Sequence, residues 1–323
     1  QKKGLWQWPL EKTMKKQLNY RELFNKWGIL FVVVFVGVLF AISNENFLTA
    51  SNVVNIFRQM AVTAIVAIGM TFIMISGDID VGVGGVACLT GMVISILMSN
   101  GVSIVVSLIA GLGVGIVLGA LNGFLVTQFN LPPMVVTLAT MNLANGAASL
   151  LTGGTAVYGL PDKFLNIGRG SILGIPNQVW LLVIFAIIAS VILNKTPFGR
   201  HVYAIGGNSD VAKLSGIHVK KVKIILYIVS GICASIGGII LSSRTGSGQP
   251  TLALTMNMNV ITAVAIGGTS LNGGSGTIRG SIMGAMMLTM ITNGLNVNGI
   301  NSYWQLVVSA VVLIITIIVN RND

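Results

Sequence analysis

Long uninterrupted apolar runs dominate this sequence. Between polar breaks they cover 28–42, 59–76, 81–98, 102–127, 134–151, 177–194, 224–242, 260–267, 281–297 and 303–319. An α-helix needs about 20 apolar residues to cross a bilayer, and only the run at 260–267 is far shorter. A transmembrane β-barrel would show short alternating segments instead of continuous runs. The sequence therefore predicts an all-α polytopic membrane protein with about ten transmembrane helices.

Charged residues are few and are gathered in two places. They make up 8% of the chain, against about 25% in soluble proteins. Of 19 Lys and Arg, seven lie within 1–26 and six within 195–223. Basic loops remain on the cytoplasmic side, so we expect both regions and both chain ends to be cytoplasmic. Residues 1–26, rich in Lys and Trp, would lie at the membrane interface, and 27–323 would form the transmembrane domain.

Two parts of the transmembrane domain match each other. A shift of 171 residues aligns Asn122-Gly123 with Asn293-Gly294 and relates a copy at about 59–151 to a copy at about 225–319. These are spans two to five and spans seven to ten. Since five spans separate the second span from the seventh, the two copies must run in opposite orientations. The sequence thus predicts an inverted repeat, which is common among transporters.

Asp78 and Asp80 lie between two of the most apolar runs of a chain that has only eight acidic residues. A carboxylate at membrane depth is a candidate metal ligand, proton relay, substrate contact or helix end. The topology places both at the cytoplasmic end of the second span. A carboxylate there can accept backbone N–H bonds and face the positive end of the next helix. We expect both to anchor this loop, with the specific role of Asp78 left open.

Glycines recur every fourth residue along the fourth span, at Gly111, Gly115, Gly119 and Gly123. Such a stripe lines one helix face with bare backbone and lets another helix approach closely in lipid. We expect a packing role, with a pore-lining role as the alternative.

The basic segment AIGGNSDVAKLSGIHVKKVK, at 204–223, separates the sixth and seventh spans. Gly206 and Gly207 break the chain, and Asn208 or Ser209 can cap a short helix over 210–214 that Gly216 can end. Such a helix would dock a soluble partner, or the segment is an ordinary surface loop.

The inventory of reactive side chains argues against an enzyme. The glycine-rich stretch at 266–280 lacks the Gly-Lys-Ser/Thr ending of a phosphate-binding loop. His201 and His218 are the only histidines, and neither lies near a cysteine or a paired acid at ligand spacing. We expect no catalytic residue, no metal and no cofactor. The basic residues do not form one accessible surface, so no nucleic acid is expected either.

Several stretches resemble a known family. They are NFLTASNVVNIFRQMAVTAIVAIGMTFIMISGDIDVGVG, RHVYAIGGNSDVAKLSGIHVKKVKIILYIVSGICASIGGII, GGTSLNGGSGTIRGSIMGAMM and NGLNVNGINSYWQ. They look like the permease subunit of the ribose/galactose/xylose class of bacterial ABC sugar importers. The resemblance covers nearly all of 28–320 and implies a fold similar to that of the cobalamin-type importers.

The resemblance also implies a location, partners and a mechanism. It implies a multi-pass protein of the bacterial inner membrane, in contact with lipid and paired with a second permease subunit as a homodimer or a heterodimer. A periplasmic or lipid-anchored binding protein would deliver a monosaccharide. An ATPase subunit with two nucleotide-binding halves would drive alternating access. By carry-over, the coupling loop 195–223 would dock the ATPase through Gly206, Gly207, Asn208, Ala212, Ser215 and Gly216.

This chain departs from the family pattern at two places. The family usually reads Glu-Leu-Asp-Ala-Ile where this chain has Asn257, Met258, Asn259, Val260 and Ile261, so two acids are replaced by amides. The family commonly has Gly where Asp78 stands. These departures leave the cargo open: a non-sugar solute such as a polyol or a sugar-derived signalling molecule is the first alternative. A proton-coupled secondary transporter that uses Asp78 or Asp80 is the second.

A sugar pathway needs amides and aromatic faces on otherwise apolar helices. The candidates are Asn122, Asn142, Asn145, Asn293, Asn296, Tyr303 and Trp304. For each of them, an interhelical hydrogen bond or an interfacial anchor is the alternative.

Overall fold

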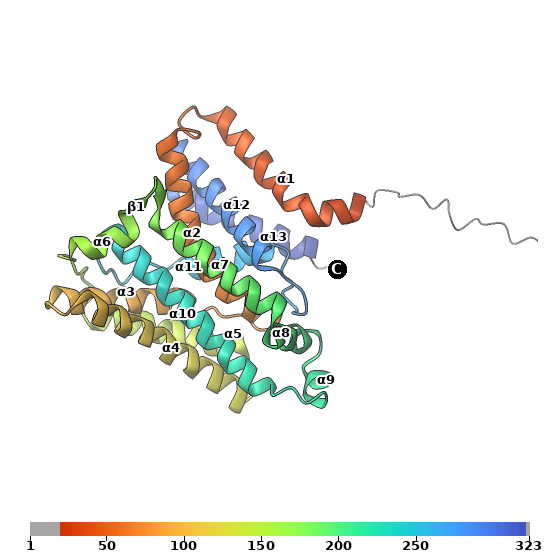
Figure 1. Ribbon diagram of the computed structural model, residues 1–323. Helices are drawn as coiled ribbons and strands as arrows, with labels where there is room; N and C mark the ends of the chain where they lie inside the picture. The colour runs from red at the N-terminus through yellow and green to blue at the C-terminus, as the bar shows by residue number, and fades with distance from the viewer. Residues whose placement is uncertain (1–19, 321–323) are drawn as a thin grey trace, which may run out of the picture.

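The computed structural model describes residues 20–320, which fold mainly as α-helices (Figure 1). The long helices are α1 Tyr20–Ser43, α2 Ala50–Ile75, α3 Val83–Ser99, α4 Ile104–Gln128, α5 Pro133–Leu150, α7 Asn177–Lys195, α10 Val219–Thr245, α12 Ile278–Val297 and α13 Ser302–Asn320. The shorter helices are α6 Asp162–Arg169, α8 Pro197–Gly207, α9 Ser209–Leu214 and α11 Met256–Ile266. A two-residue hairpin, β1 Ser171–Ile172 and β2 Ile175–Pro176, precedes α7.

Each of the ten apolar runs coincides with a helix of the structure. By length and composition, four helices of the described part can cross a membrane: α2, α4, α7 and α10. The eighth run, predicted over 260–267, is the eleven-residue α11. Residues 1–19 and 321–323 lie outside the described part, and with them most of the interfacial segment predicted at 1–26.

Helices α2 and α10 form the centre of the protein. From Met60 to Ile75, every residue of α2 is buried except Thr63. Helix α10 packs against α2, α3 and α4, and α2 packs against α10, α11 and α12. The two central helices therefore have matching sets of neighbours: α10 contacts the helices that follow α2 in the chain, and α2 contacts those that follow α10.

The segment between α5 and α7 holds structure that the apolar runs do not reveal. The amphipathic helix α6 buries Phe164 and lies across the end of α10. The Ser243 hydroxyl donates to the Phe164 carbonyl at 2.6 Å and accepts from Gly168 N–H at 2.8 Å. Helix α6 and the hairpin mark one end of the bundle, and α8 and α9 mark the other (Figure 1).

Candidate functional site

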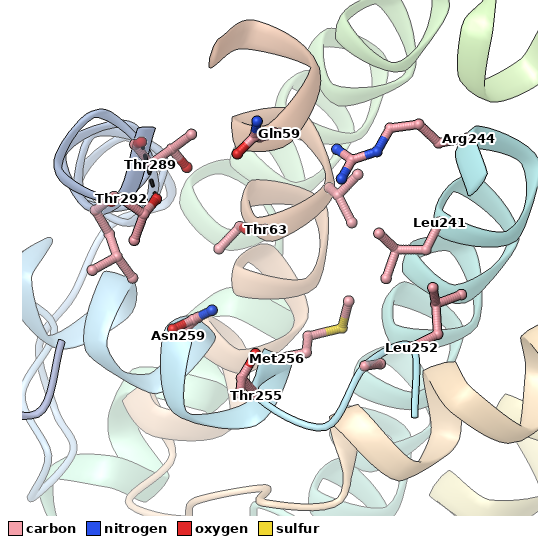
Figure 2. Close-up of a pocket in the computed structure, with 13 residues that line it drawn as sticks. Gln59, Thr63, Leu241, Arg244, Leu252, Thr255, Met256, Asn259, Thr289 and Thr292 are labelled. Atoms are coloured by element: carbon pink, nitrogen blue, oxygen red, sulfur yellow. Dashed lines mark hydrogen bonds between the residues drawn. The ribbon is translucent and has the colours of Figure 1, made fainter. Parts of the chain in front are cut away.

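A polar cavity lies between α2, α10, α11 and α12, toward the α6 end of the bundle (Figure 2). Its volume is about 220 Å³, larger than an engineered cavity of about 150 Å³ that holds benzene. The lining includes Thr63, the one residue of the α2 core stretch that is not buried. The polar side chains around it are Gln59, Thr63, Arg244, Thr255, Asn259, Thr289 and Thr292. The cavity therefore offers amides, hydroxyls and one guanidinium inside a largely apolar bundle.

Arg244 supplies the only charge among the 13 lining residues (Figure 2). It lies in the last turn of α10, where a cation suits the helix dipole. Arg169 of α6 donates through Nε to the Arg244 carbonyl at 3.0 Å, and Arg58 of α2 donates through Nη2 to the Arg169 carbonyl at 3.1 Å. Three arginines thus gather at this end of the cavity.

A second cavity of about 260 Å³ adjoins the first. Thr255, Asn259 and Thr292 line both of them. Tyr303 and Gln305 of α13 extend the polar lining outward. Because three residues are shared, the two cavities are neighbours, and together they extend from the bundle interior to the start of α13.

Two other cavities have almost wholly apolar linings. One, of about 410 Å³, lies between α2, α7, α8 and α10, and the other, of about 560 Å³, lies between α4, α7 and α10 near α6. Apolar walls of this kind suit an acyl chain and offer no hydrogen bonds to a sugar.

Of the seven residues predicted for a sugar path, the structure places only Tyr303 on the polar cavities described above. Asn293 exchanges two side-chain hydrogen bonds of 2.9 Å with Asn52 of α2, so it joins two helices. Asn122 is buried beside Gly82. Asn296 accepts a hydrogen bond from Gln305 at 2.6 Å.

The remaining three path candidates do not line these cavities. Asn142 is exposed on α5, and Asn145 is partly buried one turn further along the same helix. Trp304 is 60% exposed on α13. The polar lining residues that the sequence analysis missed are Gln59, Thr63, Arg244, Thr255, Thr289, Thr292 and Gln305. Asn259 is one of the amides that depart from the family pattern, and this departure is the sequence feature that could have indicated the cavity.

Both aspartates of the α2–α3 loop bind α10. Asp78 accepts from Lys223 Nζ at 2.7 Å and from the Tyr227 hydroxyl at 3.2 Å. Asp80 accepts from the Ser230 hydroxyl at 2.7 Å and from Gly82 N–H at 2.9 Å. Each carboxylate is therefore occupied by partners from this chain, and the pair fastens the loop to α10.

The basic segment forms a protruding helix. Asn208 caps α9, with its Oδ1 accepting from the N–H groups of Asp210 and Val211, both at 3.0 Å, which confirms the predicted short helix. Ala212 is buried, the Ser215 hydroxyl donates to the Val211 carbonyl, and Gly216 follows with φ of +85°. Leu214, at 88% exposed, and Val211, at 57%, present apolar surface at this tip.

The two glycines of this segment have different surroundings. A Cβ on Gly206 would overlap the Ile75 carbonyl, so Gly206 packs against the end of α2. A Cβ on Gly207 would meet nothing. Only Gly207 therefore belongs to the exposed surface near α9.

The glycine stripe of α4 faces α10 and α3. A Cβ on Gly115 would overlap the carbonyl of Gly231, and one on Gly119 would overlap that of Tyr227. A Cβ on Gly111 would come within 2.5 Å of Ile94 Cγ2, and one on Gly123 within 2.7 Å of Ile224 Cα. All four glycines therefore lie at close helix contacts.

Comparison with known proteins gives matches over almost the whole chain. Residues 52–317 match the family described as branched-chain amino acid transport system / permease component. The ribose import permease protein RbsC of Bacillus subtilis is 38% identical over 96% of this chain and 97% of its own. The D-allose transport system permease protein AlsC of Escherichia coli is 34% identical over 96% of both chains.

A third relative, the L-arabinose transport system permease protein AraH of Escherichia coli, is 34% identical over 95% of this chain and 94% of its own. No solved structure gives a significant match.

Proposed function

Since the chain belongs to the branched-chain amino acid transport system / permease component family, we propose that it is the permease subunit of a binding-protein-dependent ABC sugar importer. The observation that carries this proposal is the extent of the similarity. Permeases named for ribose, allose and arabinose align with at least 95% of this chain. Such a subunit is not an enzyme, and a separate ATPase would hydrolyse ATP.

The chemistry of the polar cavity supports a polyhydroxylated cargo. Its amides and hydroxyls can exchange hydrogen bonds with sugar hydroxyls, whereas a branched aliphatic side chain would leave them unpaired. We therefore place the cargo among monosaccharides and closely related polar solutes, polyols included. The path would run along the polar cavities, past Asn259, Thr292 and Tyr303.

Helix α9 is proposed as the contact with the ATPase. It protrudes from one end of the bundle with Leu214 and Val211 exposed, and its N-cap keeps it helical (Figure 1). An amphipathic helix that lays exposed apolar residues into a groove is a common docking mode. In this arrangement the α8–α9 end and both termini are cytoplasmic, and the α6 end faces the binding protein across the inner membrane.

Alternating access is proposed to use an inverted repeat, α2 to α5 against α10 to α13. Each helix of the first group has a counterpart close to 171 residues later. The packing supports this, because α10 contacts α3 and α4 as α2 contacts α11 and α12. Two such copies rocking against each other, in a homodimer or a heterodimer of permeases, would open the path to either side in turn.

Reconstitution tests the proposal. The chain would be coexpressed with the ATPase and binding protein encoded beside it and placed in proteoliposomes. The expected result is a complex whose ATP hydrolysis is stimulated by the binding protein and which takes up a labelled sugar from a pentose and hexose panel. Uptake driven by a proton gradient in vesicles that hold this chain alone would contradict it and favour a secondary transporter.

A further inference from the structure

The polar cavity contains a cation without a counter-ion. Among residues 20–320, the Arg244 guanidinium has neither a carboxylate partner nor a hydrogen-bond acceptor. The ion pair of the described part is Lys223–Asp78, at the opposite end of the bundle. None of the 13 lining residues is Asp or Glu. The guanidinium instead points into the cavity, on the side of Gln59 (Figure 2).

The surroundings add positive charge. The charges of Arg58 and Arg244 repel each other. Arg58 donates a hydrogen bond from Nη2 to the Arg169 carbonyl, and its buried Nε has no partner within the described part. The side chain opposite, Asn259, is a neutral amide. A partly desolvated guanidinium in such a place is stabilised most by an anion that accepts two of its parallel N–H bonds.

We propose that the cargo carries a carboxylate or phosphate group, as an acidic sugar does, and that this group binds Arg244. The hydroxyls of the same solute would bind the carboxamides of Gln59 and Asn259 and the hydroxyls of Thr289 and Thr292. This inference rests on the proposed permease function and narrows its substrate class. The cavity of about 220 Å³ accommodates a small ring or an open-chain acid of similar size.

Matched probes test the charge requirement directly. The full chain in nanodiscs of neutral phosphatidylcholine would be titrated with D-ribose, D-ribonate and D-ribose 5-phosphate, with binding read from saturation-transfer NMR and from the melting temperature. We expect at least one anionic probe to bind about tenfold more tightly than D-ribose, as a charged hydrogen-bonded pair implies. The preference should shrink as salt rises.

Three variants assign the preference to the cavity. Arg244→Gln should abolish it, and Asn259→Asp should weaken it while keeping the guanidinium, because the new carboxylate adds a negative charge to the cavity wall. Arg279→Gln, which removes an exposed cation of α12 outside the cavity, should leave it unchanged. If Arg244→Gln fails to fold, Asn259→Asp still decides the matter.

Several results would overturn the inference. They are equal binding of D-ribose and both anionic probes, no binding of either anionic probe, an unchanged preference in Asn259→Asp, or an equal loss in Arg279→Gln. None of these results would contradict the proposed permease function, because ATPase association and binding-protein-stimulated ATP hydrolysis do not depend on whether the cargo is charged. Conversely, failure of the complex to assemble would refute the permease proposal whatever the probes show.

Discussion

Lys223 and Asp78, 145 residues apart in the sequence, form a 2.7 Å ion pair that joins the start of α10 to the loop after α2. The Asp78 side chain is 5% exposed and that of Lys223 18%. Lys223 lies shortly after α9 in the chain, so the pair connects the proposed ATPase contact to the loop that separates α2 from α3. The ion pair also gives Asp78 a structural role, so a proton relay is not needed to account for a carboxylate at this position.

Breaking this pair should destabilise the protein. Asp78→Asn or Lys223→Met leaves one partly buried charge without its partner, which we expect to cost about 1–3 kcal/mol. The double variant should recover part of that loss, because it removes both charges. Thermal unfolding in detergent would measure the cycle. Strict additivity would show that the two side chains do not interact, and a changed pH dependence of transport in Asp78→Asn would revive the relay.

Packing between α4 and α10 should depend on individual glycines. Gly115→Ala places a methyl against the Gly231 carbonyl and should lower the melting temperature or the yield of folded protein. Gly113→Ala is the matched control, since a Cβ there meets nothing. The control should be neutral or more stable by up to about 1 kcal/mol, because alanine favours a helix over glycine. Equal behaviour of the two variants would refute a close contact.

Adjacent glycines at the end of α8 should respond differently. Gly206→Ala pushes a methyl into the Ile75 carbonyl and should loosen the junction between α8 and α2, seen as a lower melting temperature. Gly207→Ala should leave the melting temperature unchanged, because its Cβ lies in open space. If Gly207→Ala alone destabilised the isolated subunit, the assignment of the two faces would be wrong.

Leu214 should contribute to ATPase association without contributing to folding. Leu214→Ser removes a side chain that is 88% exposed, so the melting temperature should stay the same while ATPase copurification falls. Leu173→Ser is the control, since Leu173 is 89% exposed at the other end of the bundle. Copurification that falls equally in both variants, or in neither, would argue against α9 as the docking helix.

Local sequence patterns predicted much of the fold. Every apolar run became a helix, and the cap at Asn208 appeared as its side-chain chemistry required. The glycine spacing on α4 identified a face that another helix contacts closely. These features depend on residues a few positions apart, so they can be inferred before the tertiary structure is known.

Such local patterns did not predict most of the residues that line the polar cavities. Six of the seven path candidates were asparagines or a tryptophan that do not line the polar cavities, while Thr63 and Thr292 do. Hydropathy cannot separate these groups, because in a membrane protein the lipid-facing and the buried sides of a helix are both apolar. A threonine among apolar neighbours therefore gives the same local hydropathy pattern on the lipid-facing side of a helix as on the buried side.

The sequence by itself therefore determined the class of protein, the places of its helices and the loop that carries the short capped helix. Only the tertiary structure decided which polar groups share a cavity, that Asp78 pairs with Lys223, and that Arg244 faces the cavity with no carboxylate partner among residues 20–320. The physical reason is that helix periodicity specifies the residues on one face, whereas the helix that this face meets depends on the packing of the whole bundle.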